Sequence, residues 1–193
     1  MTFKETWKKI WHFLWHSNSI WSILVDIILI FLILKFVLLP GFGLIVGSKV
    51  PLVIIESGSM EHQGSFDQWW NLHGTWYKEN NISEETVSSW GFHNGMNKGD
   101  VILVTGNKNK DYKIGDVIVF SVQENNVPII HRIIAIHDLD GEIFYETKGD
   151  HNDGQHSYEK LIAKNQVLGK ASFRVPYIGW IKLFVVGIFT GKF

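Results

Sequence analysis

Two segments of this chain begin alike, Lys98-Gly99-Asp100-Val101-Ile102-Leu103-Val104 and Ile114-Gly115-Asp116-Val117-Ile118-Val119-Phe120. In each, a Gly-Asp pair precedes an apolar, β-branched run, which is the pattern of a turn that leads into a strand. Asp100 and Asp116 are therefore expected to be turn residues. Further strand candidates follow at residues 128–136, 142–147 and 167–175. Closely spaced strands with few helices between them predict a mainly β domain, folded as a barrel or as packed sheets.

The composition narrows the class of protein. A chain of 193 residues is about one domain long, and its net charge of −1 gives no positive field for nucleic acid. The absence of cysteine excludes disulfide scaffolds, thiolate zinc sites and a cysteine nucleophile. Nine tryptophans and thirteen phenylalanines are many for this length, and tryptophan favours membrane–water interfaces as well as cores.

The apolar run at residues 20–39 has the length of a transmembrane helix. Lys35 lies near one end of the run, where it can snorkel to the headgroups, whereas Asp26 needs a partner, water or a proton. Three lysines precede the run, and Lys49 is the first basic residue after it. The positive-inside rule then places the N-terminus in the cytoplasm and residues 45–176 outside it, as an extracytoplasmic β domain.

Residues 1–19 are predicted to form an interfacial amphipathic helix. Trp7, Trp11 and Trp15 recur every four residues, which makes one stripe on a helix, and the lysines lie off that stripe. This pattern is typical of a helix that lies on an anionic membrane surface, although a helix that packs on a core remains an alternative.

Two further segments are assigned from their composition. Residues 65–95 form a tryptophan-rich insert with helical spacing, which is interpreted as either a packed lid or a membrane-surface anchor. Residues 177–193 are apolar but short for a span, and are expected to be membrane-associated.

The element Glu56-Ser57-Gly58-Ser59-Met60 follows a strand candidate at residues 50–55, just outside the predicted membrane. Ser-Gly-Ser alone marks an ordinary turn in many proteins. The functional interpretation is a serine nucleophile held near the bilayer surface. The rest of the chain must decide between this interpretation and an ordinary turn.

Two later elements carry residues suited to chemistry. His131 lies in a β-branched strand, where it is either a structural histidine or a base held rigidly. Residues 147–155 form a dense polar turn that contains Asp150 and Asp153. His151, Asp153 and His156 are plausible metal ligands, but their spacing matches no ligand motif, so neither a metal nor another cofactor is expected.

In this order and spacing, Ser57-Gly58-Ser59-Met60, the Gly-Asp strands, Ile130-His131-Arg132 and Thr147-Lys148-Gly149-Asp150 resemble type I signal peptidases. The histidine indicates the archaeal and endoplasmic-reticulum branch, because bacterial members carry a lysine base there. The resemblance covers most of residues 20–180. It implies a signal-peptidase-like β-barrel or packed-sheet catalytic domain with an N-terminal transmembrane helix and a short helical insert.

The resemblance also implies roles for individual residues. Ser59 matches the nucleophile, His131 the general base and Asp150 the aspartate of the Gly-Asp element, while Ser57 and the Ser59 backbone match the oxyanion site. The family commonly has its third triad member six positions after that aspartate, but here this position is His156. The acid is therefore expected to be Asp150, or Asp153 as the alternative, or the site is a Ser–His dyad.

The implied function is a membrane-bound serine endopeptidase that removes N-terminal signal peptides from secretory preproteins. Its expected partners are signal peptides, membrane lipid and, as a candidate, the translocation machinery, with no nucleic acid. The expected location is the cytoplasmic membrane of an archaeon or, in a eukaryote, the endoplasmic reticulum membrane. The alternative function is a non-catalytic, membrane-anchored β-domain that binds a partner through the insert at residues 65–95.

Overall fold

The computed structural model describes residues 2–17, 19–122 and 125–190. By its internal contacts the chain divides into two compact units, Met1–Ile45 and Val46–Phe193, and each is described by itself. The predicted segments at residues 1–19, 45–176 and 177–193 include residues 1, 18, 123–124 and 191–193, which lie outside the described residues.

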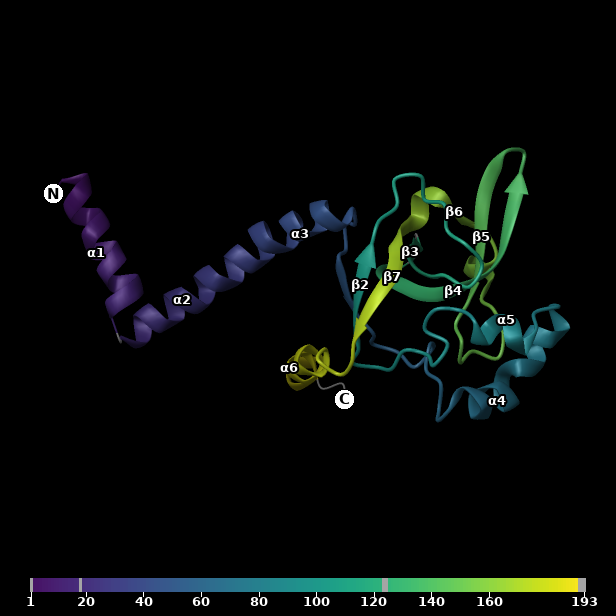
Figure 1. Cartoon of the computed structure of the whole chain (residues 1–193). Helices are drawn as coiled ribbons and strands as arrows, with labels where there is room; N and C mark the ends of the chain where they lie inside the picture. Colours follow the sequence, from purple (N-terminus) through teal and green to yellow (C-terminus); the bar gives the residue numbers. More distant parts are fainter. Residues whose placement is uncertain (1, 18, 123–124, 191–193) are drawn as a thin grey trace. The chain divides into compact units, whose positions relative to one another are not determined.

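One long apolar helical run makes up most of the N-terminal unit. The α-helix α2 (Ile20–Ile33) continues through a π-helical turn, η1 (Leu34–Leu38), into α3 (Leu39–Val46), as Figure 1 shows. Together they form a 27-residue helix, Ile20–Val46, that is long and apolar enough to cross a membrane. Pro40 does not end it, because the wider turn before the proline accommodates its ring and its missing N–H group. The run therefore extends seven residues beyond the predicted end at residue 39.

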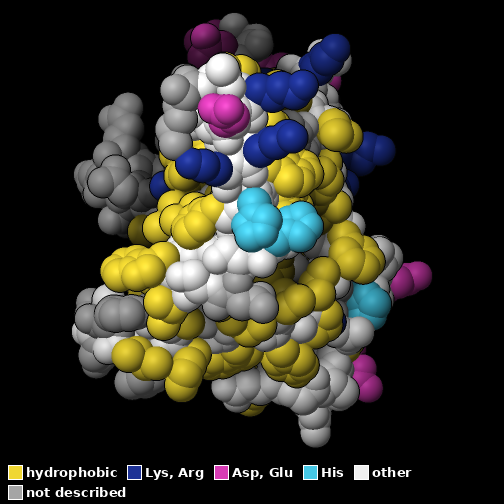
Figure 2. Space-filling model, turned by 90° about the vertical axis from the view of Figure 1, so that its left-hand side faces the viewer, with side chains coloured by type: hydrophobic (Ala, Val, Ile, Leu, Met, Phe, Trp, Pro, Cys, Tyr) yellow, Lys and Arg dark blue, Asp and Glu magenta, His cyan; other side chains and the backbone are white. Residues whose placement is uncertain are grey.

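The helix α1 (Phe3–His16) precedes this run and is amphipathic. The tryptophans Trp7, Trp11 and Trp15 are all more than half exposed, so no core in the described chain covers this stripe. On the face drawn in Figure 2, Lys, Arg and His side chains gather in the upper part of the view, with hydrophobic side chains among them. His12 and His16 stack with ring centroids 5.4 Å apart. The structure thus gives α1 one apolar face and one basic face.

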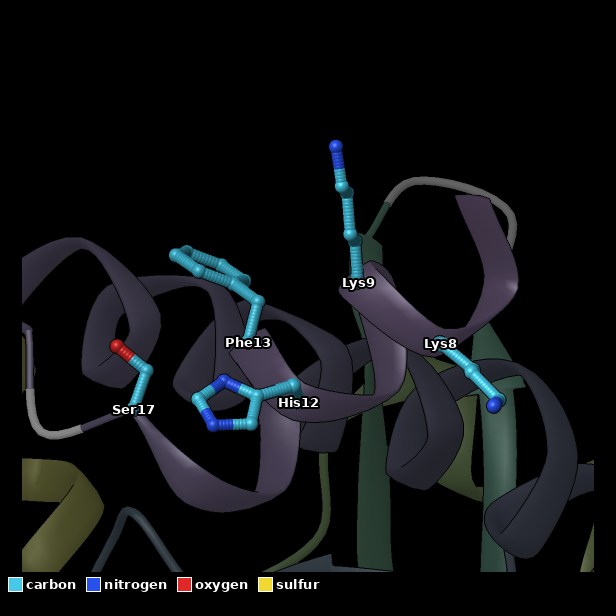
Figure 3. Close-up of a pocket in the computed structure, with 5 residues that line it drawn as sticks. All are labelled: Lys8, Lys9, His12, Phe13 and Ser17. Carbon is cyan, nitrogen blue, oxygen red and sulfur yellow. The ribbon is translucent and has the colours of Figure 1, made fainter. Parts of the chain in front are cut away.

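A shallow hollow of about 440 Å³ lies on α1. Figure 3 shows the residues that line it: His12, Phe13 and Ser17 lie near one another, and the side chains of Lys8 and Lys9 extend away from the helix.

The second unit is built on one seven-stranded antiparallel sheet, with the order β1-β2-β7-β3-β4-β5-β6. The mainly β fold predicted from the sequence is confirmed (Figure 1). The strands are β1 (Leu52–Ile54), β2 (Val101–Thr105), β3 (Val117–Val122), β4 (Asn125–Leu139), β5 (Glu142–Lys148), β6 (Ile162–Ala163) and β7 (Val167–Val175).

The two Gly-Asp pairs form turns that begin β2 and β3, as predicted. Gly99 and Gly115 have φ angles of +89° and +92°, which L side chains adopt at a cost. Asp100 Oδ2 accepts the Asn97 N–H at 2.8 Å, and the Asp116 carboxylate accepts a backbone N–H three residues before it in the same way. Both aspartates thus act as turn residues.

Both faces of the central strands are covered. In β3, Val117 and Val119 belong to one apolar core, whereas Ile118 and Phe120 belong to a second core on the other face. This explains why the strand is apolar throughout instead of alternating. A third cluster, made mainly by the insert, packs against Ile134 of β4.

Helices cover part of the sheet and end the chain. The insert folds as α4 (Phe66–Glu79) and α5 (Glu84–Ser88). Two 3-10 turns, η2 (Ser157–Glu159) and η3 (Lys164–Gln166), flank β6, and α6 (Trp180–Thr190) follows β7. Because the insert covers one face of β4, Arg132 is buried and only 1% exposed.

Candidate active site

Ser59 lies in a tight turn directly after the edge strand β1. Two backbone hydrogen bonds hold this turn: the Ile55 N–H donates to Asp100 O at 2.9 Å, and the Met96 N–H donates to Met60 O at 2.8 Å. Met60 is fully buried in the first core, next to Ile55. Buried apolar residues on both sides of the Ser-Gly-Ser element therefore fix the turn, while Ser59 itself stays partly accessible.

His131 meets Ser59 from strand β4, although 72 residues separate them. The distance from His131 Nε2 to Ser59 Oγ is 3.1 Å, which is within reach for proton transfer. The ring is 4% exposed, and its backbone pairs with Ile118 in the middle of the sheet. A rigid, buried strand thus presents the imidazole to the hydroxyl.

Glu159 lies behind the same imidazole. Its Oε1 is 2.5 Å from His131 Nδ1, and its Oε2 accepts the His156 backbone N–H at 2.7 Å. The carboxylate is fully buried in the turn η2. Ser59, His131 and Glu159 therefore form a continuous chain of hydrogen bonds. Sequence reasoning did not select Glu159, because it lies three residues beyond the position at which the family's aspartate was sought. The only local signal is its spacing from His156, where a carboxylate can return to the backbone N–H that begins the turn.

Asp150, which the sequence predicted as the acid, pairs with Arg132 in the structure and not with His131. Arg132 donates to both carboxylate oxygens of Asp150, from Nε to Oδ1 at 2.9 Å and from Nη2 to Oδ2 at 2.7 Å. His62 Nε2 lies 3.0 Å from Oδ2. Burial alone would raise the pKa of Asp150, but the charge of Arg132 and the hydrogen bonds from His62 and Arg132 outweigh it and hold the pKa well below its usual range.

The other predicted acid, Asp153, is exposed on the loop. In the part of the chain that the structure describes, no hydrogen bond or ion pair joins it to His131. Neither aspartate therefore lies behind the ring, and Glu159 does.

Ser57 is exposed, and its Oγ lies 3.2 Å from Ser59 Oγ. The structure thus brings the two serines of the Ser-Gly-Ser element together at the end of β1. The oxyanion role of Ser57 stays a prediction.

Gly149 closes the site from the loop after β5. A Cβ atom at this position would lie 2.8 Å from His131 Nε2 and 2.8 Å from Ser59 O, so a side chain would push the pair apart. The next amide but one, His151 N–H, donates to Ser59 O at 2.9 Å. The backbone of this loop therefore packs directly against the reacting pair.

A groove of about 630 Å³ opens onto Ser59 and His131. One wall is β1, which pairs with β2 and is the edge strand of the sheet among the described residues, and the opposite wall comes from the first half of β4. Its apolar lining includes Leu52, Val53, Ile54, Val127, Pro128, Ile129 and Tyr158. The free edge of β1 leaves backbone donors and acceptors for an extended peptide.

The plausible metal ligands His151, Asp153 and His156 line a different hollow of about 530 Å³ beside His73. Among the residues described, no group of three His, Asp or Glu side chains is arranged to hold a metal ion.

Comparison with known proteins finds similar sequences among signal peptidase subunits. The chain is 29% identical over 149 residues to the signal peptidase complex catalytic subunit SEC11C of human and of dog, a match that covers 74% of this chain. The SEC11 catalytic subunit of the yeast Scheffersomyces stipitis is 25% identical over 156 residues, covering 78% of this chain and 74% of that protein. This chain is a relative of signal peptidase catalytic subunits.

The resemblance expected from the sequence motifs is thereby confirmed, including its eukaryotic branch. The match spans 61% of the length of the mammalian signal peptidase subunits. No family model matches the chain.

Proposed function

We propose that this chain is a membrane-bound serine endopeptidase that removes signal peptides from secretory preproteins. The observation that carries the proposal is the 3.1 Å distance between Ser59 Oγ and His131 Nε2, with a buried carboxylate behind the imidazole. Its similarity to signal peptidase catalytic subunits supplies the substrate class.

In the proposed mechanism, Ser59 attacks the scissile carbonyl while His131 Nε2 takes the hydroxyl proton. His131 then gives this proton to the leaving amine as the C–N bond breaks. Water, deprotonated by the same imidazole, would hydrolyse the acyl-enzyme and return the proton to Ser59. Glu159 accepts a hydrogen bond from Nδ1–H, which holds the ring in the required tautomer and stabilises the imidazolium. We therefore assign Glu159, and not Asp150 or Asp153, as the third member of the triad.

The tetrahedral oxyanion would lie against the Ser59 backbone N–H and the Ser57 hydroxyl. Ser57 Oγ lies 3.2 Å from Ser59 Oγ, and both serines line the groove, which supports this role for Ser57. A donor of this kind typically contributes about 2.7–4 kcal/mol to the transition state.

The substrate would bind extended, as an added strand along β1. The groove that leads to Ser59 is lined largely by apolar residues, and we propose that it takes the small residues that precede the cleavage site of signal peptides. The competing function, partner binding through the insert, is not favoured. Trp69, Trp70 and Trp90 are at most 9% exposed, so these side chains do not form a contact face.

Membrane attachment would come from the N-terminal unit. We propose that Ile20–Val46 crosses the bilayer and that α1 lies on the cytoplasmic surface, with its tryptophans in the interface and Lys8 and Lys9 at anionic headgroups. The hollow lined by Lys8, Lys9 and His12 (Figure 3) would be a further contact for an anionic headgroup. The second unit would then lie on the opposite side of the membrane.

The named relatives come from eukaryotes and lend no support to an archaeal cytoplasmic membrane. Their names describe subunits of a complex, and we propose that this chain also works within one, with the translocation machinery as a further candidate partner. The apolar residues of α6, such as Ile181 and Val185, are exposed and would contribute a second membrane contact.

The test uses the full chain reconstituted in lipid with a model preprotein. Ser59→Ala and His131→Ala should each lower the cleavage rate by about 10⁴-fold to 10⁶-fold, because either change removes the triad's function. His137→Ala is the matched control, since His137 lies on the same strand and pairs with Glu146 at 2.6 Å outside the groove. Cleavage that survives Ser59→Ala would refute the proposed function.

A further inference from the structure

The insert helix α4 contributes no residue to the groove, yet it is bonded to the loop behind the reacting pair. Trp69 Nε1 donates to the backbone carbonyl of Asp150 at 3.1 Å, and Tyr77 OH lies 3.5 Å from Asp150 Oδ1. The Trp69 indole also stacks on His62, with ring centroids 3.9 Å apart, and His62 in turn bonds the Asp150 carboxylate. Asp150 is thus held through both its backbone and its side chain.

Lys148 makes a second connection between α4 and the same loop. Its Nζ donates to Gly149 O at 3.0 Å and lies over the rings of Trp76 and Tyr77, 5.1 Å and 5.0 Å from their centroids. The side chain is fully buried, and burial lowers the pKa of Lys148 to about 8 despite the attraction of Asp150, Glu159 and Asp153. Keeping a cation here is therefore costly, and aromatic faces of α4 offset part of that cost.

The loop transmits this support to the reacting atoms. The His151 N–H donates to Ser59 O, and Gly149 packs so closely that a Cβ atom there would lie 2.8 Å from both His131 Nε2 and Ser59 O. A displacement of this backbone by a few tenths of an ångström would change the distance from Ser59 Oγ to the ring, which in turn determines the rate of proton transfer.

We propose that α4 is a positioning element for the active site, and that Trp69 and Lys148 are its positioning residues. They hold Gly149, Asp150 and His151 against the Ser59–His131 pair without touching the substrate. This inference rests on the proposed function for its kinetic readout only. It predicts that changes on α4 lower kcat and leave KM nearly unchanged, because α4 does not line the groove.

The chain offers a matched pair of variants, Trp69→Phe and Trp70→Phe. Both tryptophans are on α4, in the same aromatic cluster, and are 1% and 4% exposed. Each substitution replaces a buried indole with a benzyl ring, but only Trp69 Nε1 has a hydrogen-bond partner among the described residues. A merely structural role predicts the same effect for both.

Two measurements are made on each variant of the full chain in lipid or detergent: preprotein cleavage, and hydrogen exchange of the amide of His151. In Trp69→Phe we expect about tenfold faster His151 exchange and about tenfold lower kcat, the typical effect of one lost neutral hydrogen bond. In Trp70→Phe both should stay within twofold of the wild type. Equal effects of the two changes, or an effect of Trp69→Phe on KM alone, would overturn the inference.

Lys148→Met provides a second, independent variant. Methionine keeps the length of the side chain and removes both the charge and the donor to Gly149 O. Because a buried cation is removed, the midpoint of unfolding should stay the same or rise, while kcat and His151 protection should fall about tenfold. An unchanged kcat would overturn the role of Lys148, whereas a fall in stability that parallels the fall in kcat would indicate a structural role only.

The exchange measurement separates this inference from the proposed function. If the wild-type chain cleaves no preprotein, the proposed function fails, but the difference in His151 exchange between Trp69→Phe and Trp70→Phe still decides whether α4 positions the loop.

Discussion

His131 and Arg132 are neighbours in β4, and each meets a buried carboxylate on its own face of the sheet. His131 pairs with Glu159, and Arg132 pairs with Asp150. All four side chains are at most 5% exposed. Burial and pairing alone therefore do not distinguish a catalytic residue from a structural one.

The two pairs differ in what else reaches them. The second ring nitrogen of His131 lies 3.1 Å from Ser59 Oγ, and both residues line the groove. The imidazole can therefore exchange a proton with the Ser59 hydroxyl or with a bound substrate. Arg132 keeps its charge at all working pH values, and its remaining donors are taken by the carbonyl oxygens of Gly91, Phe92 and Gly115. The His131–Glu159 pair can therefore take part in proton transfer. The Arg132–Asp150 pair is a fixed ionic contact that joins the insert to the sheet.

The largest effect on kcat is expected when the His131–Glu159 pair is changed. Glu159→Gln keeps the size of the side chain but offers an amide that can hold the wrong tautomer of His131. We expect kcat for preprotein cleavage to fall by about 10⁴-fold, as in triads that lose their carboxylate, with little change in stability. Glu146→Gln is the control, because Glu146 also pairs with a histidine, His137, but outside the groove. A kcat within threefold of the wild type would show that the site works as a dyad.

The second prediction concerns the Arg132–Asp150 pair. Asp150→Asn leaves the buried guanidinium of Arg132 without its counter-charge, so the free energy of unfolding should fall by about 3–5 kcal/mol. Cleavage per folded molecule should fall much less than in Glu159→Gln. Asp153→Asn, on the exposed part of the same loop, should change stability by less than about 0.5 kcal/mol. The opposite pattern, a stable Asp150→Asn protein without activity, would restore Asp150 as the catalytic acid.

The smallest effect is a pH dependence of stability. The pKa of Asp150 is depressed in the folded protein, so the unfolded chain binds the proton first as the pH falls. This contribution to stability is complete above the unfolded pKa of about 4 and is lost progressively below it, by at most about 1.4 kcal/mol per pH unit. Denaturant titrations between pH 5 and pH 2 should show the loss in the wild type and a shallower slope in Asp150→Asn. If stability falls equally steeply in the wild type and in Asp150→Asn, carboxylates other than Asp150 cause the loss of stability at low pH.

The sequence predicted the nucleophile and the base of the candidate site, but not the carboxylate that pairs with the base. Ser59 and His131 could be selected because each belongs to a short motif on a strand or at its end, and the order of the motifs is informative. Glu159 lies in a 3-10 turn with no motif of its own, and only the folded loop shows that it reaches His131 Nδ1. Asp150 was selected as the acid because the Gly-Asp motif is prominent, but prominence in sequence does not reveal that Arg132 already occupies its carboxylate.

What the sequence alone determined is local: the strands that follow Gly-Asp turns, an apolar helix of membrane-spanning length and the serine at the end of β1. These features follow from backbone sterics and hydrophobic pattern, which act over a few residues. Tertiary structure decided which carboxylate lies behind His131, that the insert buries Arg132, and that α4 supports the loop at Gly149. Those outcomes depend on which side chains meet across the fold, and a buried charge takes the partner that burial leaves within reach.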